Sequence, residues 1–272
     1  MEDFIAEWVG GILIDFQESI ESISGLLGQN LTANTNMWKM VGTVQGIVKP
    51  VCYTIMVIFF LIEFLKMSMK IDMLKWEYLF KVMAKFVIAK ACIDFGPTLM
   101  EAIYATVAEW ITKFGTSTYD ASMFTDIIKG INDELDDMGF WAMIGFAVTS
   151  IVPCLVLNIC AFVVKVIAYG RLIEIYILLA CMPIPFAFLL DGEGHANITK
   201  KYVLNFAGVC LQGLLIVISC SLFQYLMADV IATLGSTGDV TDLLFTMVLG
   251  GVVMVLAISK CGQWGKQLLN AM

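Results

Sequence analysis

Histidine and arginine are almost missing from this sequence, and catalytic motifs are missing altogether. The single His195 excludes any metal centre that needs two histidines, and it stands in a polar turn with no nucleophile motif beside it. The chain holds neither a Walker A sequence nor a G-x-G-x-x-G loop, so no nucleotide-binding signature is present. These absences predict a protein that is not an enzyme and that has no cofactor or metal. A membrane enzyme that uses His195 is the weakest of the alternatives.

Cysteine pairs and charged residues are scarce too. None of the eight cysteines forms a C-x-x-C pair, and all lie in or beside apolar stretches, which favours buried free thiols over disulfides or metal ligands. Charged residues make up 15% of the chain, against about a quarter in soluble domains. Hydrophobic residues reach 60%. They gather in runs close to the roughly 20 residues that cross a bilayer, at 51–65, 141–164, 173–190, 203–226 and 243–258.

This pattern predicts an all-α, polytopic integral membrane protein with five to six transmembrane helices and an N-terminal amphipathic helix. Apolar residues recur every three or four positions from Ile5 to Leu27, with acidic residues between them. The predicted helix over 3–28 can lie in the outer headgroup region or pack against a neighbouring subunit. No basic residue precedes Lys39, so we expect no signal peptide and an extracytoplasmic N-terminus on a multi-pass protein of the cell membrane.

Charge and hydropathy divide the chain into four expected regions. The first is an N-terminal amphipathic extracytoplasmic helix and linker (1–40), followed by a first transmembrane region with a lysine-rich cytoplasmic connection (41–111). A polar acidic extracytoplasmic loop (112–140) then leads into a C-terminal transmembrane bundle (141–272). Gly96-Pro97 should bend or break the helix that begins near Trp76. Residues 141–190 have room for two spans around Gly170-Arg171. Six crossings would place the basic C-terminus outside, whereas the positive-inside rule favours five crossings with that end inside.

Several basic side chains fall at or near membrane depth, where a charge costs at least about 2.5 kcal/mol and needs a partner or a wet cavity. They are Lys66, Lys70, Lys81, Lys85, Lys90 and Arg171. One interpretation is a basic lining or cytoplasmic contact that attracts a polyanion such as DNA. The other is ordinary positive-inside anchoring, with Lys90–Asp94 and Arg171–Glu174 as ion pairs within the membrane.

Small residues inside the apolar runs allow helices to approach closely. The candidates for helix packing are Gly208, Gly213, Gly250 and Gly251. Gln212, which stands in the middle of an apolar run, is expected to form an interhelical hydrogen bond. We interpret these residues as packing or assembly positions rather than as a substrate path.

Residues Arg171–Leu190, a polar turn, and then the run from Tyr202 to Ile216 form the least generic part of the sequence. There an apolar helix ends in Met182-Pro-Ile-Pro-Phe186, and a short polar loop leads into a long apolar helix. This arrangement resembles the core of TrbL-type conjugal transfer proteins, in the version found in Gram-positive conjugative elements. The positions that match the motif of that family are Arg171, Glu174, Pro183, Pro185, Phe186 and Gln212.

The resemblance implies a component of a type IV secretion machine, assembled as a homo-oligomeric ring in the cytoplasmic membrane. It implies contacts with membrane lipid and with other secretion components, including coupling and assembly ATPases, and transient contact with DNA or protein cargo. It also implies a channel or scaffold subunit on the translocation path. The alternative function is a small-solute or ion transporter or channel, which broken helices and charges within the membrane would also suit.

Overall fold

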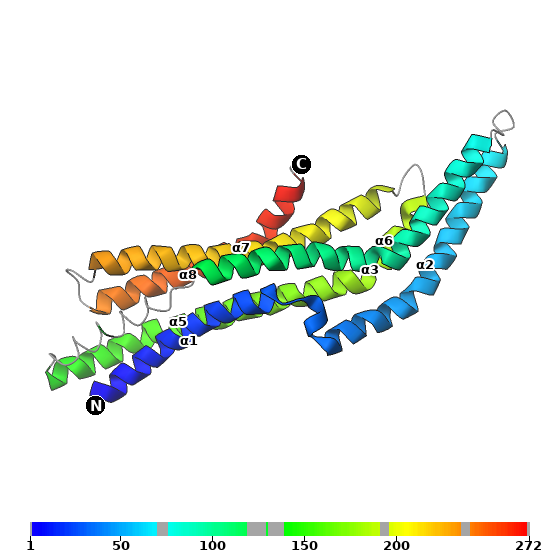
Figure 1. Ribbon diagram of the computed structural model, residues 1–272. Helices are drawn as coiled ribbons and strands as arrows, with labels where there is room; N and C mark the ends of the chain where they lie inside the picture. The colour runs from blue at the N-terminus through cyan, green and yellow to red at the C-terminus, as the bar shows by residue number, and fades with distance from the viewer. Residues whose placement is uncertain are drawn as a thin grey trace. The chain divides into compact units, whose positions relative to one another are not determined.

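A computed structural model describes residues 2–69, 76–118, 129, 139–190, 196–234 and 240–270. The elements that it defines in these ranges are all helical, in agreement with the predicted all-α class (Figure 1). In chain order they are α1 (Glu2–Gly28), η1 (Leu31–Ala33), α2 (Thr35–Met69), α3 (Trp76–Thr118), α5 (Phe140–Cys181), α6 (Pro183–Ala187), η3 (Phe188–Leu190), α7 (Ala196–Leu234) and α8 (Val240–Asn270).

The amphipathic pattern of the N-terminus forms α1, as predicted. Its apolar positions from Val9 to Leu27 are buried, and Asp15, Glu18 and Glu21 are exposed on the other side. The ring of Phe16 packs edge-on against Phe223 of α7, with centroids 5.8 Å apart. The apolar face is therefore covered by helices of the same chain, and the expectation that it lies among headgroups or against a neighbouring subunit is wrong.

Two expected interruptions are absent from the described helices. α3 continues through Gly96-Pro97, and α5 continues through Gly170-Arg171 as one helix of 42 residues. Proline in a helix costs about 3 kcal/mol, so close packing has to offset it. At Gly96 that packing is tight, because an added Cβ would meet the Met182 side chain at 1.5 Å. At Gly96-Pro97 tertiary contact therefore outweighs the local preference to break, and the division of 141–190 expected at Gly170-Arg171 is absent because α5 is continuous there.

The chain divides into two compact units. The first contains residues 1–28, 108–171 and 212–264, and the second contains 29–107, 172–211 and 265–272. In the first unit, buried side chains such as Phe16, Leu157 and Val217 form the core. In the second, α2 and α3 run side by side (Figure 1), and the rings of Phe60 and Phe86 meet at 4.9 Å.

Four segments of the described residues are long and apolar enough to cross a membrane. They are Thr35–Lys66, Phe140–Leu190, Asn197–Met227 and Leu244–Leu269. α3 is not among them, since lysines and acids interrupt its apolar stretch. Large apolar side chains are exposed along these segments, as expected for surfaces that meet lipid. The protein is therefore a multi-span membrane protein, and the expected total of five to six crossings stays a prediction.

Candidate functional site

The proline segment ends α5 and begins α6, with Pro183 in the first turn of the short helix. A proline has no N–H, so Pro183 leaves the carbonyl of Leu179 without its normal partner four residues on. The side chain of Gln45 on α2 supplies the missing donor, because its Nε2 donates to the Leu179 carbonyl at 2.9 Å. Gln45 is buried. The end of α5 is thus completed by a side chain from another helix.

Two side chains from α7 also bond the same segment. Thr199 donates its hydroxyl to the Pro185 carbonyl at 2.7 Å, and Tyr202 donates its phenol to the Leu178 carbonyl. Phe186, which follows Pro185 directly, is buried. Side chains of α2 and α7 therefore converge on the backbone carbonyls near Pro183 and Pro185, and they fix the direction in which the chain leaves α5.

Gln212 lies at the contact between α7 and α8 and has no exposed surface. Its Nε2 donates to the Gly262 carbonyl at 2.8 Å, while its Oε1 is buried without a hydrogen-bond partner. Arg171 reaches the same point, because a Cβ added to Gly262 would lie 2.7 Å from its Nη2. Glycine at 262 thus leaves room for the Arg171 guanidinium. Glu174, one turn after Arg171, is half-buried.

The predicted basic residues do not form a single stripe. Lys81 and Lys85 are four residues apart on one face of α3, whereas Lys90 is about half a turn away from Lys81 at 100° per residue. Lys81 and Lys90 are exposed and Lys85 is half-buried. Lys66 lies 3.6 Å from Glu63 on α2. Lys70 lies outside the described residues.

The expected ion pair between Lys90 and Asp94 is not present among the described side chains. The carboxylate of Asp94 instead accepts a hydrogen bond from the phenol of Tyr53 on α2. A tyrosine partner allows the carboxylate to stay half-buried between two helices without a neighbouring cation. The structure therefore pairs Asp94 with Tyr53 and not with Lys90.

The four glycines proposed for packing have different amounts of room. An added Cβ would lie 2.4 Å from Met227 at Gly250 and 3.3 Å from Leu157 at Gly251. At Gly208 and Gly213 the nearest atoms would be 3.4 and 3.5 Å away, which is ordinary contact. At all four glycines the nearest atoms belong to other helices of the same chain. Gly250 is consequently the position at which a side chain would disturb packing most.

Side chains suited to catalysis or metal binding do not gather in the part of the chain that the structure describes. No group of three or more His, Cys, Asp or Glu residues in these ranges could hold a metal ion. The eight cysteines are all described, and each is a free thiol that is buried or half-buried. His195 and the acidic residues of 131–138 lie outside the described residues.

The residues that sequence reasoning missed are polar side chains that bond backbone carbonyls or a carboxylate of other elements. They are Gln45, Tyr53, Tyr176, Thr199 and Tyr202. Gln45, a few residues before the apolar run at 51–65, gave a usable signal, because a buried amide needs a partner. The tyrosines gave no such signal, since tyrosine is also enriched at membrane–water interfaces, where it needs no partner within the protein.

Comparison with known proteins points to a family. A family model described as TrbL/VirB6 plasmid conjugal transfer like protein matches residues 16–183, more than half of the chain. The matched range includes Arg171, Glu174 and Pro183 and ends before Phe186 and Gln212. No curated protein and no solved structure matches the chain significantly.

Proposed function

The chain belongs to the TrbL/VirB6 family of plasmid conjugal transfer proteins, and we propose that it is a channel or scaffold subunit of a conjugative type IV secretion system. In this proposal several copies form a ring in the cytoplasmic membrane and contribute to the path of DNA or protein cargo. Partner ATPases supply the energy, in keeping with a sequence that contains no Walker A motif. The short central loop of the sequence, unlike that of the larger Gram-negative members, supports the version found in Gram-positive conjugative elements.

α3 is the observation that carries the proposal. Its 43 residues span about 65 Å at 1.5 Å per residue, more than enough to cross a hydrocarbon core of about 30 Å. Yet α3 exposes Lys81 and Lys90 together with large apolar side chains such as Phe95, which is 71% exposed. Lysines within a membrane need protein or water beside them, whereas exposed phenylalanines favour lipid or protein. A ring of copies around a wet passage provides both environments.

The experiment replaces Lys81 and Lys85 with Gln in donor cells and measures the frequency of conjugal transfer. We expect a fall of about tenfold or more, since two lost charge contacts on the order of 1 kcal/mol each correspond to at least that factor. Native mass measurement of the purified variant should still show the same oligomer as the parent protein, because neither side chain is buried in the helix contacts.

The matched control replaces Lys200 and Lys201, two exposed lysines at the start of α7, with Gln. It removes the same charge elsewhere and should leave transfer within about twofold of the parent. Normal transfer by the Lys81/Lys85 variant would show that the pair only anchors α3. A monomeric parent protein with saturable uptake of a small solute would replace the channel proposal with a transporter.

A further inference from the structure

Asn158 is a polar residue on the surface of an apolar stretch of α5. It stands within the uncharged run 141–164, seven residues before Lys165, and its side chain is exposed. Thr149 is also exposed on α5, but its hydroxyl donates to the Gly145 carbonyl of the same helix at 2.8 Å. Asn158 makes no hydrogen bond with any described residue. Acyl chains offer an amide neither donor nor acceptor, so Asn158 needs a partner that lipid does not supply.

Lys90 on α3 has the same need. It is exposed and has no ion pair or hydrogen bond among the described side chains, since Asp94 accepts its bond from Tyr53. At 100° per residue Lys90 lies about 180° around α3 from Lys81 and about 140° from Lys85. A passage that Lys81 and Lys85 face therefore does not account for Lys90, and a lysine within the membrane needs protein or water beside it.

Each of these residues belongs to a row of exposed apolar side chains in which steps of three and four residues alternate. The α3 row is Phe80, Met83, Val87 and Lys90, and the α5 row is Ile151, Leu155, Asn158 and Phe162. Such spacing keeps a row facing one neighbouring helix in left-handed packing, the usual arrangement in membrane bundles. Both rows therefore suit contact with another helix, and each contains one polar residue without a partner.

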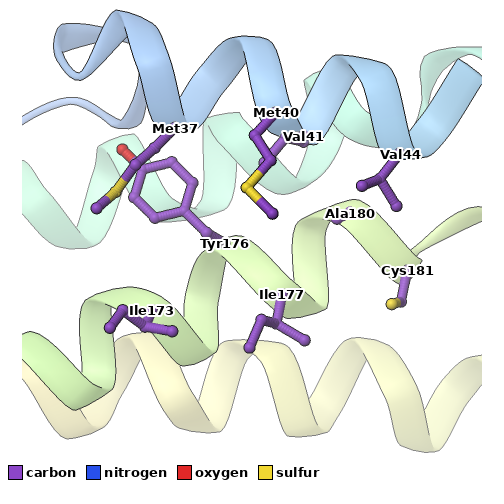
Figure 2. Close-up of a pocket in the computed structure, with 9 residues that line it drawn as sticks. All are labelled: Met37, Met40, Val41, Val44, Ile173, Tyr176, Ile177, Ala180 and Cys181. Carbon is purple, nitrogen blue, oxygen red and sulfur yellow. The ribbon is translucent and has the colours of Figure 1, made fainter.

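The apolar groove between α2 and α5 in the second unit differs in this respect (Figure 2). Of its nine lining residues, only Tyr176 carries an oxygen in its side chain, and that phenol donates to the Leu31 carbonyl at 2.7 Å. Lipid can cover this groove without leaving that hydroxyl unpaired. The groove therefore indicates no partner, whereas the α3 and α5 rows each do.

Lys90 and Asn158 lie at similar depths if α3 and α5 each cross the membrane, as the proposed function requires. Trp110 and Trp141 are exposed near the predicted outer ends of these helices, where indole rings mark the membrane interface. Lys90 precedes Trp110 by 20 residues and Asn158 follows Trp141 by 17, which correspond to about 30 Å and about 26 Å of helix. A flexible lysine side chain can span the remaining difference of about 4 Å.

We propose that the α3 row of one copy packs against the α5 row of a neighbouring copy, where the Lys90 ammonium donates to the side-chain carbonyl of Asn158. The two groups are complementary, because an ammonium only donates and an amide oxygen accepts. The contact uses a different face of each copy, and head-to-tail contacts of this kind close into rings. It rests on the proposed function, since it joins the copies of the ring while Lys81 and Lys85 face the passage.

The test co-expresses two full-length chains with different affinity tags, one carrying Lys90→Cys and the other Asn158→Cys, and oxidises the membranes with copper phenanthroline. We expect a disulfide-linked product that carries both tags, which a bond within one chain cannot give. The matched control combines Lys90→Cys with Thr149→Cys, an exposed position about 180° around α5 from Asn158, and should give less than about a tenth of this product.

Substitutions at the two positions test the hydrogen bond itself. Asn158→Leu and Lys90→Met should each raise the dissociation constant of the purified oligomer about tenfold, and the double variant should raise it no further, because either change removes the shared bond. Thr149→Val removes a hydroxyl that is satisfied within its own helix and should change the constant less than about twofold.

Two outcomes separate this contact from the proposed function. An oligomeric parent protein that forms no product with both tags, and whose dissociation constant does not respond to Asn158→Leu, would overturn the contact and leave the ring standing. A parent protein that is monomeric in native mass measurement would overturn both.

Discussion

The Leu179 carbonyl is an oxygen that its own helix cannot satisfy. In an α-helix its partner would be the N–H of residue 183, and that residue is proline. Gln45 is the replacement donor, from a position 134 residues earlier in the chain. A buried carbonyl without a partner costs about 1–3 kcal/mol. One amide side chain thus makes a proline acceptable at the end of a long apolar helix.

Gln45→Leu should therefore lower the free energy of unfolding by about 1–3 kcal/mol, because leucine keeps the volume but leaves the Leu179 carbonyl unpaired. Denaturant unfolding in detergent micelles, followed by tryptophan fluorescence, measures the change. Gln263→Leu makes the same substitution at an exposed position of α8 and should stay within about 0.5 kcal/mol of the parent. Equal stabilities of the two variants would contradict the role assigned to Gln45.

Pro183→Ala gives a second prediction at the same carbonyl. Alanine restores an N–H at position 183, which can donate to Leu179 when Gln45 is gone. The substitution should therefore recover part of the stability lost in Gln45→Leu, with a coupling energy on the order of 1 kcal/mol across the double-mutant cycle. The four unfolding free energies give this coupling directly. Strict additivity of the two substitutions would mean that the carbonyl finds another partner.

At the scale of helices, the contact between α7 and α8 depends on a missing side chain at Gly250. Alanine there would place its Cβ 2.4 Å from Met227 and 3.0 Å from Phe223. Gly250→Ala should cost about 1–3 kcal/mol through overpacking, although alanine is the better helix former. Gly145→Ala, on α5 with open space around it, should instead stabilise by about 0.5–1 kcal/mol. Thermal unfolding in detergent measures the change in melting temperature of both variants. Equal changes would show that the packing of α7 against α8 does not depend on the absence of a side chain at Gly250.

Periodic patterns in the sequence predicted elements well, because each pattern reports a local preference. The apolar repeat placed the first helix at 3–28, and α1 begins one residue earlier and ends at the same residue. The break considered at Gly96-Pro97 and the division of 141–190 at Gly170-Arg171 were wrong, because α3 and α5 continue through these points, and at Gly96 the helix packs closely against Met182.

The candidate site was less predictable, for a physical reason. The motif around Pro183 was visible in the sequence, but the side chains that complete it come from far away. Gln45 bonds a carbonyl 134 residues on, and Tyr176 bonds one 145 residues back. Such pairs depend on how helices are placed side by side, and no local pattern encodes that placement. Asp94 has Tyr53 and not Lys90 as its partner for the same reason, because the placement of α2 beside α3 brings Tyr53 to it.

For the whole molecule, the continuity of α5 bears on the number of crossings. Its 42 residues extend about 63 Å, so one helix replaces the two spans expected in 141–190. If α3 crosses as well, it makes five crossings together with the four apolar segments, which is the number we predict. With the N-terminus outside, Lys200 and Lys266 fall on the cytoplasmic side and Asp242 on the outer side, as the positive-inside rule favours. Hydropathy and charge no longer conflict in this arrangement.

Cysteines placed on either side of the α5 segment test this topology. Trp141, the second residue of α5, is 82% exposed, and Lys200, near the start of α7, is also exposed. A single crossing predicts that Trp141→Cys reacts with a membrane-impermeant maleimide on intact cells, while Lys200→Cys reacts only after permeabilisation. The parent protein is the control, since its own cysteines are buried or half-buried. Reaction of both variants on intact cells would instead place both ends on the outer side, which requires the chain to turn back within 141–190 and raises the number of crossings to six.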